Sequence, residues 1–192
     1  MRHRLTLIVV FLTIAAPATA QADWLLTPFA GINFGGSTAG EKVNYGASLA
    51  FMGAGILGFE VDFGFAPNFF EPDPEPFDLV GDSNVTTLMV NLVGGIPIGG
   101  QTGGGVRPYV SGGVGLLKTN VESPDGFFSV HNNDFGVNVG AGVTGFFNDH
   151  IGVRGDLRYF RNLTDPEEDN EFDIDFGGFN FWRGTAGVVF RF

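Results

Sequence analysis

Alternation of apolar and polar residues is the feature that most constrains how this chain can fold. Across 59–65 every odd position is Phe or Val, and the even positions are Glu60, Asp62 and Gly64. Side chains of a β-strand point alternately to opposite faces, so a period of two predicts a strand with one apolar and one polar face. The same alternation appears in eight segments, near residues 24–35, 43–53, 59–65, 87–92, 106–119, 135–147, 153–159 and 182–192.

The connections between these segments are expected to alternate between short and long. Short connections are expected near 53–56, 97–105 and 148–150, and longer loops near 36–42, 67–84, 120–133 and 163–179. Short turns on one side and longer loops on the other are typical of an outer-membrane barrel whose N-terminus lies in the periplasm. An even number of strands also places both ends of the barrel domain on the same side.

Hydropathy indicates that this sheet lies in a membrane. Charged residues make up only 16 % of the chain and the mean hydropathy is +0.17, whereas soluble domains carry about 25 % charged residues. Beyond the N-terminal segment, no apolar run reaches the ~18 residues that a spanning helix needs. A membrane-embedded chain without such helices must close its strands, since only closure satisfies every backbone polar group in lipid. The prediction is an all-β protein, an eight-stranded antiparallel up-and-down transmembrane β-barrel.

The N-terminal segment indicates export. Two Arg residues precede an apolar run at 5–16, and a small-residue cleavage site of the A-x-A type follows it. These are the three parts of a secretory signal peptide, and the apolar run is shorter than the ~20 residues of a spanning helix. We expect a cleavable signal peptide at 1–22, with cleavage after Ala22 preferred to cleavage after Ala20, and a barrel domain at 23–192 in the cell outer membrane.

Cysteine content and net charge exclude several classes of function. The chain has no cysteine, which excludes disulfides, thiolate metal sites and a cysteine nucleophile. Its formal net charge of −11 gives no electrostatic footprint for nucleic acid. No cofactor is expected.

The direction of the apolar face decides between a membrane barrel and a soluble, lipocalin-like one, and alternation alone does not give that direction. The polar faces carry charged residues together with many glycines, which suits a narrow charged interior. Isolated charges inside an eight-stranded barrel would be costly, so opposite signs are expected to pair and to close the lumen. The expected members of this charge network are Glu60, Asp62, Arg154, Asp156, Arg158, Arg183 and Arg191.

Several stretches of the sequence are similar to those of a known family. A Phe-Arg-Phe segment at the end of an alternating strand resembles the sorting signal read by the barrel-assembly machinery, with Phe190 and Phe192 as its aromatic residues. The stretches 27–31, 107–115 and 149–160 are similar to strands of small outer-membrane proteins. Together they resemble the OmpA/OmpX/OmpW-like outer-membrane β-barrel family across the whole mature chain.

This resemblance implies an architecture and a set of partners. It implies a barrel that contacts outer-membrane lipid and lipopolysaccharide and is inserted by periplasmic chaperones and the barrel-assembly machinery. Barrels of this type differ mainly in their loops, so the resemblance is nearly silent about activity. No periplasmic peptidoglycan-binding domain follows the barrel in this sequence, so a wall-anchoring role is not expected.

Motifs that could carry enzyme chemistry are weak. G-x-G-x-x-G occurs at 53–58 and 140–145, but its dinucleotide-binding form needs a following helix, and more β pattern follows both copies. Some eight-stranded barrels are lipid A-modifying enzymes with Ser and His at the outer membrane edge. Ser129 and His131, in the loop expected at 120–133, could mimic that pair, because a Ser-x-His spacing can place both on one side of an extended segment. No third member of a catalytic constellation can be assigned, so the preferred interpretation is a pair of loop residues without a catalytic role.

The last long loop is strongly acidic. Carboxylates in such a cluster can hold Ca²⁺ or Mg²⁺, because hard cations prefer oxygen ligands. Their spacing matches no tight site, so a solvated, self-repelling loop is preferred, with weak divalent binding beside lipopolysaccharide phosphates as the alternative. The candidate ligands are Asp165, Glu167, Glu168, Asp169, Glu171, Asp173 and Asp175.

The function favoured by these observations is that of a small non-enzymatic outer-membrane barrel with a structural role in the envelope and acidic extracellular loops. The first alternative is a narrow porin-like channel or an uptake barrel for small or hydrophobic solutes. A surface adhesin and a lipid A-modifying enzyme are the less favoured alternatives.

Overall fold

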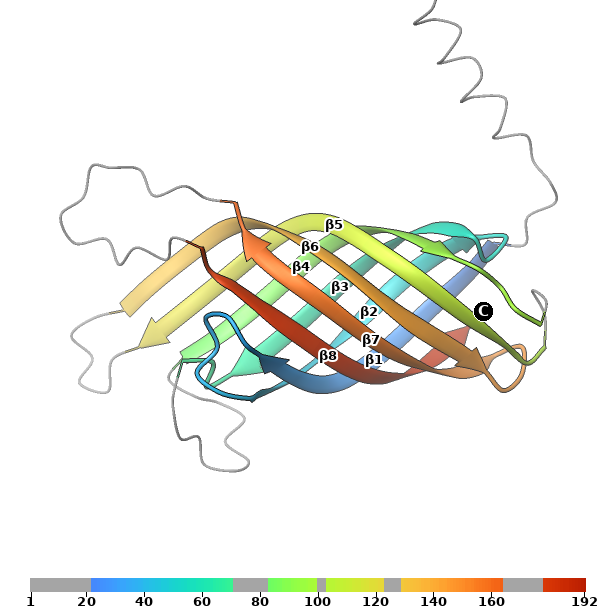
Figure 1. The fold of residues 1–192 in the computed structure, drawn as a ribbon, viewed down its shortest axis with the longest axis horizontal. Coiled ribbons are helices and arrows are strands. Elements are labelled where there is room, and N and C mark those ends of the chain that lie inside the picture. Colours follow the sequence, from blue (N-terminus) through green and yellow to red (C-terminus); the bar gives the residue numbers. More distant parts are fainter. Residues whose placement is uncertain (1–21, 71–82, 100–102, 123–128, 164–177) are drawn as a thin grey trace, which may run out of the picture.

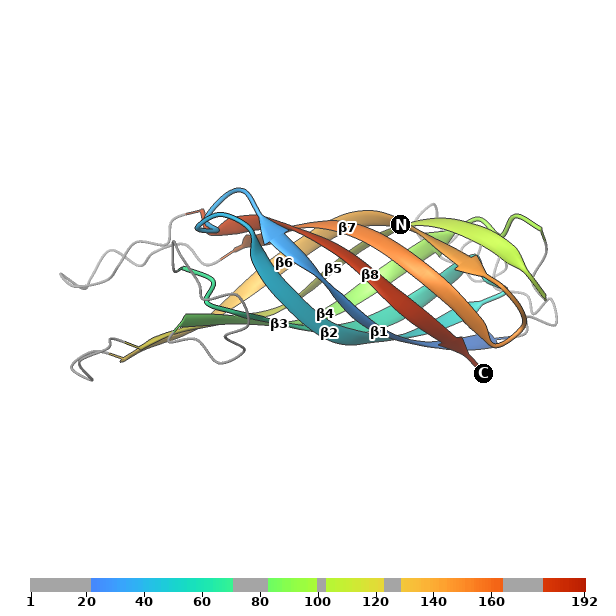
Figure 2. The ribbon, with the colours of Figure 1, turned by 90° about the horizontal axis from the view of Figure 1, so that it is seen from below.

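The computed structural model describes residues 22–70, 83–99, 103–122, 129–163 and 178–192. They form a closed barrel in which every strand pairs with its neighbours in the sequence, and β1 pairs with β8 (Figures 1 and 2). The predicted eight-stranded antiparallel up-and-down barrel is confirmed. The strands are β1 (Ala22–Phe34), β2 (Lys42–Gly53), β3 (Leu57–Pro67), β4 (Ser83–Gly95), β5 (Gly105–Glu122), β6 (Ser129–Phe146), β7 (Ile151–Asn162) and β8 (Asn180–Arg191).

β5 and β6 are longer than the alternation predicts. They run past the limits expected at 106–119 and 135–147 and project beyond their neighbours (Figure 1). Ser129 and His131, which were predicted in a loop, lie in β6, and His131 stands opposite Asn120 of β5. A hairpin that projects from the barrel has no lipid to face, so its residues need not alternate between apolar and polar. The pairing of β5 with β6 therefore continues beyond the residues that alternate.

The two ends of the barrel differ in their connections. The turn end, where β1 begins and β8 ends, carries the connections 54–56, 96–104 and 147–150. The loop end carries 35–41, 68–82, 123–128 and 163–179. The contrast in length is weaker than predicted, because 96–104 is longer than two of the loop-end connections.

The tightest turn joins β2 to β3. Ala54 and Gly55 both adopt left-handed backbone, with φ of 50° and 66°, and Ile56 N donates to Gly53 O at 3.0 Å. Two successive residues with positive φ match the right-handed twist of the strands that the turn connects.

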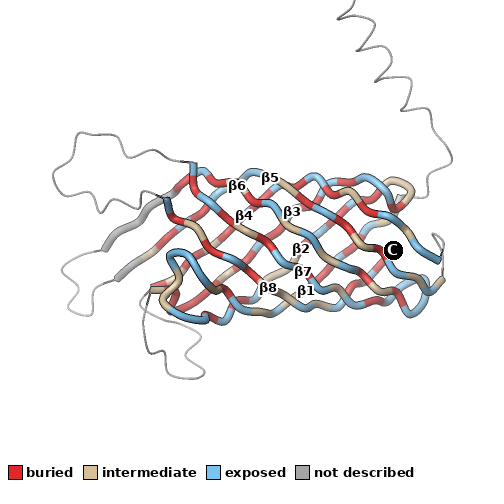
Figure 3. Tube along the Cα trace, viewed as in Figure 1, coloured by how far each residue is buried: buried red, intermediate tan, exposed pale blue. Residues whose placement is uncertain are grey.

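The apolar face of the sheet points outward. On β3, Phe59 and Phe63 are 62 % and 47 % exposed, whereas Glu60 and Asp62 are 1 % and 2 % exposed. The same alternation of exposed and buried positions runs along the other strands (Figure 3). This excludes a lipocalin-like barrel with an apolar interior.

Aromatic rings lie on the outer face near both ends of the barrel. The ring centroids of Trp24 and Phe51 are 5.1 Å apart at the turn end, and those of Tyr159 and Trp182 are 5.2 Å apart at the loop end. Aromatic girdles on both sides of an apolar band are typical of transmembrane barrels. The described part of the chain has no helix long and apolar enough to span a membrane.

Side chains fill the interior in layers. One apolar cluster lies toward the turn end and includes Leu25, Met52 and Val93. A second lies toward the loop end, where Phe160 stacks on Phe181 with ring centroids 4.9 Å apart. The rings of this loop-end cluster are called the aromatic cap: Phe69, Phe70, Phe160, Phe179 and Phe181. Charged side chains occupy the layer between the two clusters.

Candidate functional site

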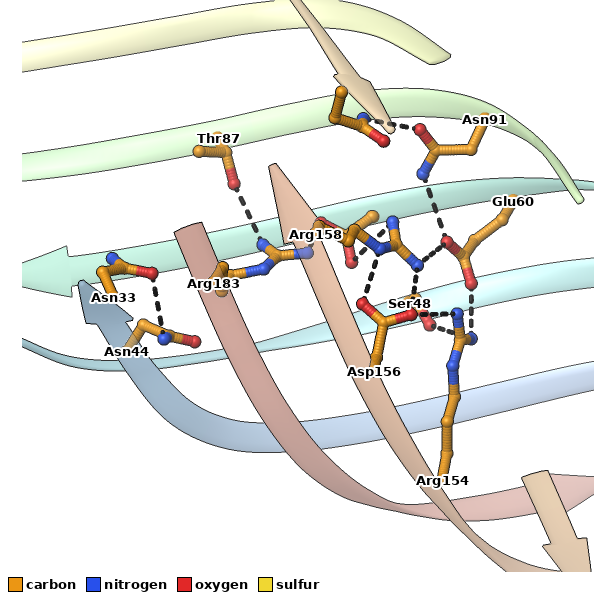
Figure 4. A network of polar contacts seen from close by, with 12 residues as sticks. Asn33, Asn44, Ser48, Glu60, Thr87, Asn91, Arg154, Asp156, Arg158 and Arg183 are labelled. Atoms are coloured by element: carbon orange, nitrogen blue, oxygen red, sulfur yellow. Dashed lines mark hydrogen bonds and ion pairs between the residues drawn. The ribbon is translucent and has the colours of Figure 1, made fainter. Parts of the chain in front are cut away.

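Glu60 on β3 is the centre of a polar network in the middle of the barrel (Figure 4). Its Oε2 accepts a hydrogen bond from Arg154 Nη1 at 2.5 Å, and its Oε1 accepts one from Arg158 Nη2 at 2.6 Å. Asn91 Nδ2 on β4 donates to the same Oε1 at 3.2 Å. Both Arg residues stand on the inner face of β7, so Glu60 joins two strands that are four apart in the barrel.

Asp156 supplies the second carboxylate of the network. Its Oδ1 accepts from Arg158 Nε at 2.7 Å, and its Oδ2 lies 3.4 Å from Arg154 Nη2. The hydroxyl of Tyr109 on β5 donates to Asp156 Oδ2 at 2.5 Å and accepts from Arg154 Nε. The Arg154 guanidinium also lies over the Tyr109 ring, 4.5 Å from its centroid, a distance at which a cation is attracted to the ring.

Asp62 supplies the third carboxylate. Its Oδ1 accepts from Arg183 Nη2 on β8 at 2.7 Å, and its Oδ2 lies 3.7 Å from Arg158 Nη1. The Arg183 guanidinium is packed over the rings of Phe29 and Phe160, at 5.0 and 4.7 Å. Asp62 therefore extends the network from β7 to β8.

The network is electrically balanced. Three guanidiniums and three carboxylates take part, and Arg158 contacts all three carboxylates. Burying unpaired charges costs several kcal/mol each, and good geometry with additional hydrogen bonds offsets that cost. Neutral partners from the other walls supply such bonds: Ser48, Thr87, Asn91, Tyr109 and Asn138.

Arg191 does not join the other predicted network residues. It points inward as expected, but its guanidinium lies at the turn end, where Nε donates to Asp149 O at 2.5 Å. Nη2 lies 3.3 Å from Asp149 Oδ1. The expectation that Arg191 belongs to the central network is therefore corrected. Alternation gives the face of a strand on which a residue lies, but not its height along the barrel axis.

Sequence reasoning missed two residues of β5. Arg107 and Tyr109 point inward, and they alternate with the exposed Val106 and Val110. This pattern is visible in the sequence, but the glycines that follow it on β5 obscured the register.

The interior around the network holds little free space. One cavity of about 10 Å³ borders Asp62 and Arg158, and another of about 20 Å³ borders Glu60 and Arg107. A water molecule needs roughly 10–15 Å³ measured in this way, so each cavity has room for about one water.

The remaining predicted residues lie elsewhere. Phe190 and Phe192 are on the outer face, 40 % and 67 % exposed, and Phe192 exchanges backbone hydrogen bonds with Trp24 of β1 at 3.0 and 3.1 Å. The acidic candidates Asp165, Glu167, Glu168, Asp169, Glu171, Asp173 and Asp175 lie outside the described residues. Within the described ranges, no group of three or more His, Asp or Glu side chains is placed to hold a metal ion.

The comparisons with known proteins agree with this architecture. The family model of the outer membrane protein beta-barrel domain matches residues 6–192, and the chain belongs to that family. It is therefore a small outer-membrane β-barrel. No curated protein sequence matches the chain.

Three solved structures illustrate the likeness. The chain is similar to the N-terminal β-barrel domain of OprF from Pseudomonas aeruginosa, with a TM-score of 0.57 and 18 % identity over 90 % of this chain and 99 % of that one. Neisserial surface protein A has a TM-score of 0.60 and 16 % identity over 89 % and 99 %. Ail of Yersinia pestis, in complex with the heparin analogue sucrose octasulfate, has a TM-score of 0.52 and 13 % identity over 89 % and 98 %. At these identities the likeness concerns the fold alone.

Proposed function

We propose that this protein is a closed, non-enzymatic barrel with a structural role in the outer membrane. The observation that carries the proposal is the network of Glu60, Asp62, Arg154, Asp156, Arg158 and Arg183, which joins β3 to β7 and β8 through the middle of the lumen. The interior of an eight-stranded barrel is only just wide enough for side chains to fill it. A neutral, hydrogen-bonded network in that space leaves no continuous path for water or ions.

Single-channel conductance in planar bilayers tests this proposal. The wild-type protein is expected to be silent, and Arg154→Ala/Arg158→Ala is expected to leak because two of the side chains that fill the lumen are gone. Arg161→Ala is the matched control, since Arg161 is on the same strand but on its exposed face. A large, steady pore in the wild type would overturn the closed-barrel proposal and favour a channel or an uptake barrel.

The proposal that the barrel is not an enzyme rests on the lack of an assigned third catalytic residue beside its Ser-x-His pair. Ser129 and His131 lie in β6 opposite Glu122 and Asn120 of β5, and no third member of a catalytic constellation is assigned to them. Mass spectrometry of lipid A from cells with and without the protein tests this point. A change in acyl chains or phosphates that depends on His131 would establish an enzyme.

We further propose that the loop end faces outward from the cell and the turn end faces the periplasm. The loop-end segments 71–82 and 165–175 carry five and seven carboxylates and no Lys or Arg. Such segments repel a polyanion such as a sulfated glycan. Weak binding of Ca²⁺ or Mg²⁺ by Asp165, Glu167, Glu168, Asp169, Glu171, Asp173 and Asp175 stays a prediction, which calorimetry on an all-Asn/Gln variant of 165–175 tests.

Assembly by the barrel-assembly machinery and periplasmic chaperones is likewise proposed. Phe190 and Phe192 lie on the outer face where β8 meets β1, and they are the aromatic residues proposed to guide insertion. Phe192→Ser is expected to reduce the amount of heat-modifiable barrel in the membrane fraction. A normal amount of inserted barrel would contradict this role.

A further inference from the structure

A small cavity of about 10 Å³ lies at the turn end of the barrel, outside the central network. Arg107 and Arg191 form two of its walls, and Phe146 forms a third. Its lining contains two cations and no carboxylate. This composition differs from that of the deeper cavity on the other side of Arg107, which Glu60 borders.

Arg107 has donors that no described residue satisfies. The side chain is 4 % exposed, and its Nη2 makes a long contact of 3.5 Å with Asp23 Oδ2. Its Nε and Nη1 are buried and have no acceptor within the described part of the chain. A guanidinium remains charged in proteins, and burying its N–H groups without acceptors costs free energy. The arrangement therefore points to an acceptor that the described residues do not supply.

The position of Arg107 depends on two glycines. A Cβ at Gly55 would lie 2.6 Å from Arg107 Nη2, and a Cβ at Gly95 would lie 3.2 Å from Arg107 Cγ. Larger residues at these positions would displace the guanidinium. Both glycines thus leave room for the Arg107 side chain in the mouth of the barrel.

The two guanidiniums at the cavity are more deeply buried than the carboxylates with which they pair. Both guanidiniums pack against Phe146, with Arg107 Cζ at 5.3 Å and Arg191 Cζ at 4.4 Å from the ring centroid. The side chains of Asp23 and Asp149 are 18 % and 58 % exposed, against 4 % and 6 % for the two Arg side chains. Water screens exposed charges more strongly than buried ones, so the guanidiniums are screened less than their partner carboxylates.

We propose that this cavity binds one small monatomic anion of the chloride type. Its volume is close to the space that a single water molecule requires, which is too small for a phosphate. An anion there would accept hydrogen bonds from Arg107 and hold the guanidiniums in place at the turn-end mouth of the barrel. The site is independent of the closed lumen proposed above, because it lies outside the central network.

Crystals of the wild-type protein transferred from chloride to bromide test the proposal directly. An anomalous bromide peak is expected between the guanidiniums of Arg107 and Arg191. Density for water alone, without an anomalous peak, would overturn it. This measurement needs no variant and so does not depend on whether a substitution folds.

Thermal unfolding in detergent provides the second measurement. Chloride is titrated against gluconate at constant ionic strength for the wild type, Arg107→Gln and Lys118→Gln, the last being the matched control with its exposed cation on the same strand. Arg107→Gln loses charge-assisted hydrogen bonds to the anion, so its half-saturating chloride concentration is expected to rise at least about tenfold. The control is expected to respond as the wild type does. Equal chloride responses in all three proteins would overturn the proposal.

Discussion

Arg158 and Glu60 meet in the centre of the barrel although 98 positions separate them in the sequence, with Nη2 donating to Oε1 at 2.6 Å. Both side chains are 1 % exposed or less. The contact is one of several that tie β3 to β7 across the lumen, and each Arg involved also contacts Asp156. Stability therefore depends on the balance of charges here as well as on the sheet.

Replacing Glu60 with Gln is expected to destabilise the barrel strongly. The change keeps the shape of the side chain but leaves Arg154 and Arg158 with too little negative charge around them. Breaking a buried ion pair by removing one partner costs about 3–5 kcal/mol. Urea unfolding in lipid vesicles measures the free energy of unfolding. Glu41→Gln, at an exposed position, is expected to change it by less than about 0.5 kcal/mol, and equal effects of the two changes would contradict the prediction.

A charge on the outer face is expected to be costly near the middle of the barrel and tolerated at its edge. Val90 is near the middle of β4 and 53 % exposed, and Ile96 is just beyond β4 at the turn end and 69 % exposed. Arg at the bilayer midplane costs about 2–4 kcal/mol and near the interface about 0–1 kcal/mol. We expect Val90→Arg to lower the free energy of unfolding in vesicles by the larger amount and Ile96→Arg by the smaller. Similar losses would mean that the apolar band is placed differently.

Replacement by Ala is expected to change the free energy of unfolding in different ways at two neighbouring glycines. A Cβ at Gly142 would overlap the Tyr109 hydroxyl and lie 2.5 Å from Gly155 O, whereas a Cβ at Gly155 meets nothing within 4 Å. Gly142→Ala is expected to cost about 1–3 kcal/mol through overpacking. Gly155→Ala is expected to be neutral or stabilising by up to about 1 kcal/mol, since Gly is unfavourable inside strands. Chemical denaturation of both variants in one lipid composition makes the comparison.

The aromatic cap is expected to fix the loop end of the barrel. Phe69 follows β3, is fully buried, and packs 5.2 Å from Phe181 and 5.7 Å from Phe179. Phe69→Ala is expected to lower the free energy of unfolding by about 3–5 kcal/mol. It is also expected to accelerate amide hydrogen exchange in residues 66–70. Phe70→Ala is the control, because Phe70 is only partly buried, and its effect should be smaller. Unchanged exchange in the Phe69 variant would show that the cap does not hold this segment.

Alternation predicted the strands well because the two faces of a membrane barrel meet very different surroundings. Phe59 and Phe63 face outward while Glu60 and Asp62 face the lumen, and the period of two records this difference directly. Where the two faces of a strand do not meet different surroundings, the sequence does not alternate and no strand is predicted. The outer part of β6, with Ser129 and His131, lacks the alternation and was therefore assigned to a loop.

The candidate site was predicted less completely than the fold. Alternation identified the inner faces of β3, β7 and β8 and hence the six residues of the central network. It missed Tyr109, and it placed Arg191 with that network. Which inward residues share a level depends on strand tilt and stagger, which follow from how the barrel closes, so no single segment of sequence contains this information.

The seam between β1 and β8 is the pairing that closes the sheet. Trp24 N donates to Phe192 O at 3.0 Å, and Phe192 N donates to Trp24 O at 3.1 Å. Until β1 and β8 pair, the sheet has two unpaired edges, and each is a template for pairing with another chain. Closure of this one seam removes both edges at once, so an open sheet is the form of this barrel most exposed to pairing with other chains.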